Sequence, residues 1–202
     1  MIYTSSYRDI DLKAFKDQVL SISGDRGKLV DYNGECYPKL APKKDFWNKW
    51  HDNIGKISDI ENAKYYIDSY YKEILSKLDV NKEFKELENK ILLCYEDPRA
   101  FCHRSIVAAW FELYLGLSVP EVKQKGDVLV EVQRGKFVKK YLEEVIKENV
   151  DMKGFNTLYS LNLYNKSEEL LNNAKTNSDI ELAKYLENLA FERDEKDKVK
   201  IL

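Results

Sequence analysis

Chemically reactive side chains gather in one short segment of the chain, residues 94–104, which contains two cysteines, two carboxylates and a Cys-His-Arg run. A thiolate can attack an electrophile, and an imidazole changes charge near neutral pH. A carboxyl group in a half-buried pocket can act as a general acid or base. We therefore predict that Cys102, His103 and Glu96 are catalytic residues. The alternative for a cysteine in such a segment is a small buried core residue.

The position of this segment favours an anionic ligand. Residues 90–96 form a nearly continuous apolar run, which predicts a strand buried on both faces, and residues 105–115 predict a helix. Ligands of open α/β sheets bind beyond the carboxyl ends of the strands, and a helix N-terminus attracts anions. We expect Arg104 to contact a phosphate or carboxylate there. In the competing interpretation, Arg104 bonds loop carbonyls and Glu96 forms a salt bridge with Arg99 or Arg104.

Two other predicted strands also end in polar residues. Residues 2–5 are β-prone, and residues 18–23 alternate like a strand before a turn at residues 24–27. If the three strands are parallel, their carboxyl ends share one crevice, and side chains from each end face a common ligand. The residues that we predict to bind substrate or an anion are Arg104, Arg26, Asp25, Ser5, Tyr7 and Tyr95.

The same segments resemble the family called domain of unknown function 488. The resemblance rests on LLCYE at residues 92–96, followed by CHR at residues 102–104 and a helix. Residues 2–7, 20–23 and 37–42 support it, the last through a Leu-Ala-Pro sequence, and it covers residues 1 to about 122. Many members end the second strand with an Asp-Val-Arg-like sequence, where this chain has Ser-Gly-Asp-Arg. The resemblance implies an α/β fold and a site at the Cys-His-Arg motif, without a reaction.

A metal site is a further interpretation of the same residues. Cys94, Cys102 and His103, joined by Cys36 or His51, could form a zinc site. Zinc-binding sequences usually place their ligands in close pairs such as C-x-x-C, and this chain has no such pair. We therefore predict no metal and no other cofactor.

The remaining sequence predicts the elements that position these residues. Strands and helices alternate up to residue 122, which is typical of an α/β fold with a small, mostly parallel sheet flanked by helices. The clearest helix starts after Ser58, which forms a capping-box pattern with Glu61. After an alternating segment at residues 127–133, the sequence is mainly helical. We predict an α/β domain over residues 1–122 and a mainly helical extension over residues 123–202.

Composition limits the class of protein. Of 202 residues, 44% are hydrophobic. The chain has 33 Lys and Arg and 35 Asp and Glu, and the resulting net charge of −2 gives no general attraction to nucleic acid. The eight glycines and four prolines exclude collagen and Pro/Gly-rich disorder, and three cysteines exclude a disulfide scaffold. No apolar run approaches the ~18 residues of a membrane span. With no signal-peptide pattern either, we expect a cytoplasmic protein with reduced thiols and no membrane partner.

Together these patterns predict a small enzyme, either a hydrolase or a transferase. Its expected substrate is phosphate-bearing, a nucleotide or a nucleic-acid component bound at the Cys-His-Arg crevice. Trp47 and Trp50 lie near His51 and two lysines, a combination that can stack bases, although tryptophans at this spacing usually pack a helix. The alternative is a non-catalytic module that binds nucleotides, nucleic acid or a protein.

Overall fold

The computed structural model describes the backbone of residues 1–98 and 100–201, and the side chains of those residues up to 197. The chain forms two compact units. The first comprises Met1–Glu112 and Ser118–Ile146, and the second comprises Leu113–Leu117 and the chain from Lys147 onward. The predicted site residues all lie in the first unit.

Within the described residues, the first unit contains a five-stranded sheet of order β2-β3-β1-β4-β5. Strands β1, β2, β3 and β4 are mutually parallel, and β5 runs antiparallel to β4. Because β3 lies between β1 and β2, the carboxyl ends of these three strands are neighbours. The strands are thus parallel, which is the condition for the crevice predicted from the sequence. The strands span Tyr3–Ser6 (β1), Val19–Ser21 (β2), Ile91–Cys94 (β3), Glu121–Lys125 (β4) and Val128–Val132 (β5).

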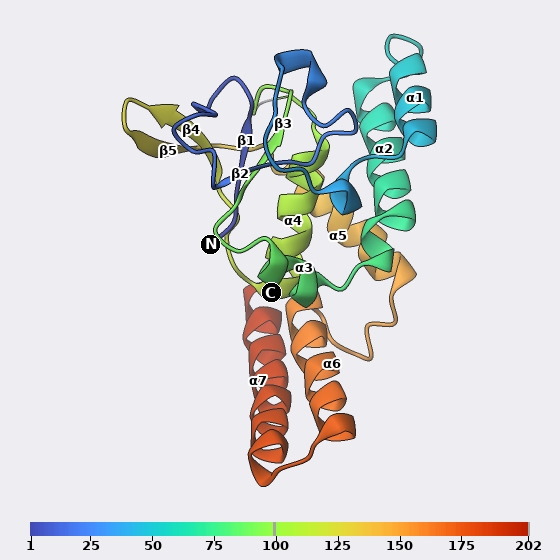
Figure 1. Ribbon diagram of the computed structural model, residues 1–202. Helices are drawn as coiled ribbons and strands as arrows, with labels where there is room; N and C mark the ends of the chain where they lie inside the picture. The colour runs from blue at the N-terminus through green and yellow to red at the C-terminus, as the bar shows by residue number, and fades with distance from the viewer. Residues whose placement is uncertain (99, 202) are drawn as a thin grey trace. The chain divides into compact units, whose positions relative to one another are not determined.

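Strand β3 is buried at every position, because both faces of the sheet are covered. Helices α1, α2 and α4 lie on one side of the sheet (Figure 1). Irregular segments cover the other side, where Leu93 belongs to a hydrophobic cluster with Tyr7 and Ile10. Since successive side chains of a strand point to opposite faces, Cys94 points away from that cluster, toward the helical side.

The helices around the sheet follow the sequence pattern. Ser58 and Glu61 form the predicted capping box at the start of α2, with both reciprocal hydrogen bonds. Helix α4 begins directly after Cys102 and is buried on most sides. The helices that lie wholly or mostly in the first unit are α1 (Lys44–Asp52), α2 (Asp59–Glu73), α3 (Val80–Glu86), α4 (His103–Leu115) and α5 (Phe137–Asn149). Short 3₁₀ helices occur at Lys28–Val30, Pro38–Leu40 and Leu75–Lys77.

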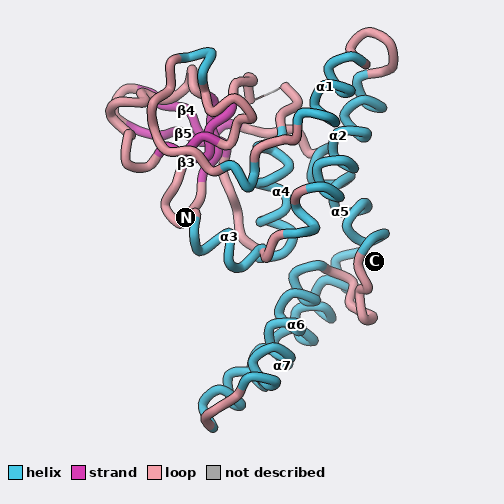
Figure 2. The backbone as a smooth tube through the Cα atoms, turned by 45° about the vertical axis from the view of Figure 1, so that its right-hand side comes forward, coloured by secondary structure: helices cyan, strands magenta, loops and turns pink. Residues whose placement is uncertain are grey.

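The second unit is dominated by a helical hairpin. Helices α6 (Leu158–Asn173) and α7 (Asn177–Ile201) run side by side in opposite directions (Figures 1 and 2). The buried carboxylate of Asp194 accepts hydrogen bonds from the backbone and side chain of Asn156, just before α6. Among the described residues, no helix combines the length and apolar character needed to cross a bilayer.

The predicted fold class is confirmed: a mostly parallel sheet flanked by helices precedes a helical C-terminal region. One strand was not predicted from the sequence, namely β4. The predicted domain boundary, between residues 122 and 123, lies inside this strand. The alternating segment at residues 127–133 contains β5, which pairs with β4 along its whole length.

Candidate active site

A cavity of about 590 Å³ opens at the carboxyl ends of β2 and β3. Four of its lining residues, Cys94, Glu96, Cys102 and His103, form what we call the reactive cluster. Four others, Trp47, Trp50, Tyr66 and Phe101, form what we call the aromatic wall. The cavity therefore combines a chemically reactive group of side chains with a surface suited to a flat ring.

The reactive cluster is built from the end of one strand and the start of one helix. Cys94 is the last residue of β3, whereas Cys102 precedes α4 and His103 is its first residue. The Sγ atoms of Cys94 and Cys102 lie 3.6 and 3.9 Å from Nδ1 of His103. All three side chains are buried. The short loop from β3 to α4 therefore brings two thiols onto one nitrogen of the imidazole.

A backbone carbonyl fixes the orientation of the imidazole. Nε2 of His103 lies 2.9 Å from the carbonyl oxygen of Ile22, at the end of β2. Because a carbonyl only accepts hydrogen bonds, Nε2 carries the proton and donates it. In the neutral ring, Nδ1 is then the atom with the free lone pair, and it faces the two sulfur atoms.

The two cysteines differ in acidity. Burial raises the pKa of the Cys102 thiol, but a hydrogen bond from Cys94 and the nearby positive charge of Arg104 act against it, and this pKa lies well below its usual value. The hydrogen bond to Cys102 and burial raise the pKa of Cys94. Burial and the nearby Cys102 also raise the pKa of the Glu96 carboxyl. Cys102 is thus the more acidic thiol of the pair, and Cys94 is the less acidic one.

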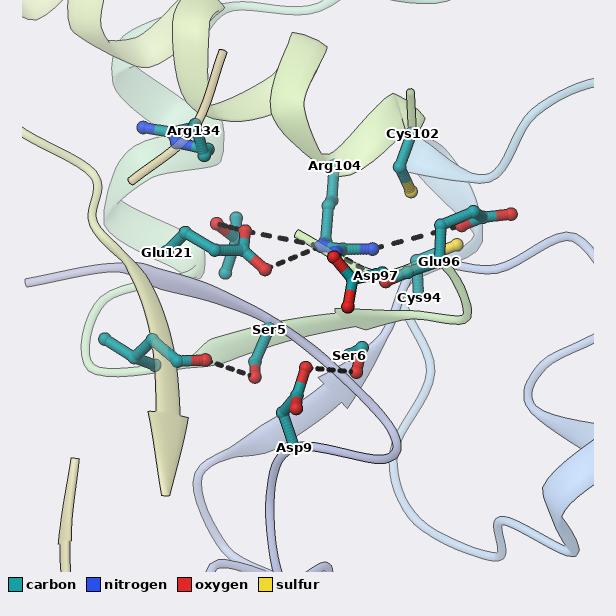
Figure 3. Close-up of polar contacts among 12 residues, drawn as sticks. Ser5, Ser6, Asp9, Cys94, Glu96, Asp97, Cys102, Arg104, Glu121 and Arg134 are labelled. Atoms are coloured by element: carbon teal, nitrogen blue, oxygen red, sulfur yellow. Dashed lines mark hydrogen bonds and ion pairs between the residues drawn. The ribbon is translucent and has the colours of Figure 1, made fainter. Parts of the chain in front are cut away.

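Arg104 lies between Glu121 and Glu96 and is fully buried (Figure 3). Its Nε donates to the carboxylate of Glu121 at 3.0 Å, and its Nη2 donates to the backbone oxygen of Glu96 at 2.7 Å. Its Nη1 is 3.9 Å from Oε2 of Glu96, and both of these buried atoms lack a hydrogen-bond partner among the described residues. Arg104 does not line the cavity. It bonds a loop carbonyl, as the competing interpretation of the sequence predicted. Arg99, the other arginine of that interpretation, lies outside the described residues.

Two of the residues predicted to bind substrate or an anion also line the cavity, Asp25 after β2 and Tyr95 after β3. The hydroxyl of Tyr95 donates to the carboxylate of Asp25 at 2.6 Å, and both residues line the cavity. Burial raises the pKa of Asp25, but hydrogen bonds from Tyr95 and Gly27 outweigh this effect and lower it. Asp25 is consequently an anionic acceptor at the cavity.

The structure places Ser5, Tyr7 and Arg26 outside the cavity lining. The buried hydroxyl of Ser5 donates to the backbone oxygen of Val122, and the buried hydroxyl of Tyr7 bonds the hydroxyls of Ser21 and Ser23. Arg26 is exposed and adopts a left-handed backbone conformation with φ 63°. The structure therefore brings Glu96, Cys102, His103, Asp25 and Tyr95 together, and leaves Ser5, Tyr7, Arg26 and Arg104 in other surroundings.

The aromatic wall extends the site beyond the predicted residues. The rings of Trp50, Tyr66 and Phe101 contact one another, with centroids 5.3–6.1 Å apart. Trp47 is 41% exposed, and Lys44 of the same helix also lines the cavity. The spacing of the tryptophans beside lysines indicated this surface from the sequence. Nothing in the sequence indicated that Tyr66, in the middle of α2, would join it.

Comparison with known proteins identifies the family of this segment. A family model described as the active DUF488-N3 subclade matches residues 17–115. This segment is a DUF488 domain. The match includes all residues of the reactive cluster and the aromatic wall, and it confirms the resemblance noted in the sequence. Neither a curated protein nor a solved structure was found to match the chain.

Proposed function

We propose that the protein is an enzyme, a hydrolase or a transferase, whose substrate is a nucleotide or a related phosphate-bearing compound. The observation that carries this proposal is that the reactive cluster and the aromatic wall line one cavity. The aromatic wall would hold the flat base, and the reactive cluster would meet the bond that changes.

The size and chemistry of the cavity support a nucleotide-sized ligand. A volume of about 590 Å³ lies within the range of small-molecule sites. Aromatic side chains stack on nucleobases, because both have flat π faces. Lys44 and His103 are the basic side chains among the described lining residues, and Lys44, which is exposed, can pair with a phosphate. Asp25 can accept a hydrogen bond from a sugar hydroxyl or an exocyclic amine.

Turnover, rather than binding alone, explains the reactive cluster. An imidazole and a carboxyl group in largely buried surroundings are costly to desolvate, and stacking a base requires neither of them. Clusters of ionisable groups with shifted pKa values are typical of active sites. The DUF488-N3 subclade model that matches this domain is itself described as active.

The test measures binding and turnover separately for a panel of nucleosides and nucleoside mono-, di- and triphosphates. We expect Trp47→Ala to weaken binding, because it removes an exposed part of the aromatic wall. We expect Glu96→Gln to retain binding and lose turnover. The matched control is Asp97→Asn, since the neighbouring acidic residue is not among the cavity-lining residues.

Three outcomes would contradict the proposal. The first is that no compound of the panel binds the wild-type protein. The second is that Glu96→Gln turns the substrate over as fast as the wild type. The third is binding without any chemical change to the ligand, which would establish the non-catalytic nucleotide-binding module instead.

A further inference from the structure

The donor atoms of Cys94, Cys102 and His103 lie within 4.8 Å of one another. A tetrahedral zinc site has Zn–S bonds of about 2.3 Å and Zn–N bonds of about 2.0 Å, so each sulfur lies roughly 3.6 Å from the nitrogen. The observed sulfur-to-Nδ1 distances are 3.6 Å for Cys94 and 3.9 Å for Cys102. Each sulfur atom therefore already lies close to a zinc-ligand separation from the imidazole nitrogen.

The environment of the imidazole fits the same interpretation. A histidine that binds a metal usually donates its other ring N–H to a carbonyl or carboxylate, which fixes the tautomer and the ring plane. His103 has this arrangement, because Nε2 donates to the backbone oxygen of Ile22 while Nδ1 faces the sulfur atoms. His51, the other histidine of the chain, is exposed and stacks on Trp47.

The ligand types select among metals. Two cysteine sulfurs and one imidazole nitrogen suit zinc, whereas magnesium and calcium prefer oxygen ligands. All three residues line the cavity, so a fourth coordination position can open toward it. Three protein ligands with one open position are typical of catalytic zinc sites, and the fourth position there is occupied by water or substrate.

We propose that Cys94, Cys102 and His103 bind a zinc ion whose fourth coordination position faces the aromatic-walled cavity. Glu96 lines the same cavity, and its carboxylate oxygen Oε2 has no hydrogen-bond partner among the described residues. A zinc ion at such a position lowers the pKa of its bound water toward neutrality.

The proposal stands apart from the nucleotide chemistry, because zinc content is measured without any substrate. The experiment quantifies zinc by elemental analysis in protein purified under reducing conditions, and then after removal and restoration of the metal. We expect one zinc ion per chain in the wild type. We expect its loss in Cys94→Ser, Cys102→Ser and His103→Ala.

The chain supplies its own matched controls. Cys36 and His51 are the remaining cysteine and histidine, so Cys36→Ser and His51→Gln change the same side-chain types outside the cluster. Both should keep one zinc ion per chain. Glu96→Gln should also keep it, because Glu96 is not among the three proposed ligands.

A cobalt titration of the metal-free wild type gives a second measurement that needs no variant to fold. Tetrahedral Co²⁺ bound by thiolates gives intense visible absorption and a sulfur-to-metal charge-transfer band. We expect both, with saturation at one equivalent and reversal by added Zn²⁺. A wild type that shows neither the cobalt spectrum nor bound zinc overturns the proposal. So does equal zinc content in folded Cys102→Ser and in the wild type.

Discussion

Arg104 is a fully buried, charged residue that holds together the segments next to the reactive cluster. It joins Glu121 of β4 to the backbone of Glu96, and Thr4 of β1 also donates to the Glu121 carboxylate. The Arg104 guanidinium also lowers the pKa of Cys102, together with the larger effect of Cys94. Arg104 thus bonds β4 and the loop after β3 directly, and it is linked to β1 through Glu121. Its charge also acts on the Cys102 thiol.

Removing this charge alone should destabilise the fold. Arg104→Met leaves the Glu121 carboxylate buried without its cation, which we expect to cost about 3–5 kcal/mol of unfolding free energy. The double variant Arg104→Met/Glu121→Gln removes both charges and should recover most of the loss. Urea unfolding measures both, and equal stabilities for the single and double variants would contradict this account.

Tyr7 was predicted to bind a ligand because it comes at the end of a strand, and a single substitution tests this prediction. Tyr7→Phe removes hydrogen bonds to Ser21 and Ser23, whose hydroxyls also bond each other. We expect a loss of about 1 kcal/mol in unfolding free energy with unchanged ligand affinity. Calorimetric binding of a nucleotide identified in the panel, compared with thermal unfolding, separates the two effects. A large loss of affinity at wild-type stability would restore the role predicted from sequence.

The sequence located the site better than it selected the residues there. Residue types and the strand-to-helix pattern were sufficient to point to Cys102, His103 and Glu96. Ser5 lies in β1 and Tyr7 directly follows it, but the direction of a side chain changes with each residue along a strand. Tyr7 packs in the cluster that contains Leu93, on the face opposite Cys94. The position of Tyr7 in the sequence does not show on which face of the sheet its side chain lies.

Helix α2 is the element that sequence predicted most securely, and it carries part of the aromatic wall. Its capping box and apolar spacing are local signals, so they needed no knowledge of the partners. Tyr66 and Tyr70 both lie on its buried face, where Tyr70 donates to the backbone oxygen of Leu40. The buried face of α2 thus supplies the wall residue Tyr66 and also packs into the core.

Loss of the cap should therefore reduce stability with little effect on chemistry. Ser58→Ala removes the acceptor for the Glu61 backbone N–H, and we expect a loss of about 1 kcal/mol in unfolding free energy. Chemical denaturation measures this loss. Ser76→Ala is a suitable comparison, because Ser76 only donates to a carbonyl one turn earlier and should change stability less. Equal losses would show that the cap is not the cause.

Strand β4 escaped prediction for a physical reason. Its sequence, Glu-Val-Lys-Gln-Lys, has one apolar residue and is typical of an exposed segment. Glu121 is nevertheless buried, because Arg104 and Thr4 satisfy its carboxylate. A partner in a distant part of the chain thus determines the burial of this strand, and no local pattern contains that information.

At the scale of the whole molecule, the first compact unit extends to Ile146. The predicted boundary at residue 122 divides β4 and removes β5 from the sheet. A parallel sheet that loses strands in this way exposes an unpaired edge, which favours aggregation.

Fragments of the chain distinguish the two boundaries. We expect a fragment of residues 1–122 to be insoluble or to lack cooperative unfolding. A fragment of residues 1–146 keeps both strands and should be better folded. Circular dichroism during thermal unfolding provides the measurement. Equal cooperativity in both fragments would show that β4 and β5 are dispensable for the sheet.

Two of the three tryptophans of the chain, Trp47 and Trp50, line the cavity, whereas Trp110 is buried in α4. The cavity consequently contains its own optical reporter. A ring stacked on the aromatic wall should quench indole fluorescence, and a cobalt ion at the reactive cluster should quench it by energy transfer. The double variant Trp47→Phe/Trp50→Phe should lose most of both signals. Unlabelled protein can thus report occupancy of its own site in real time.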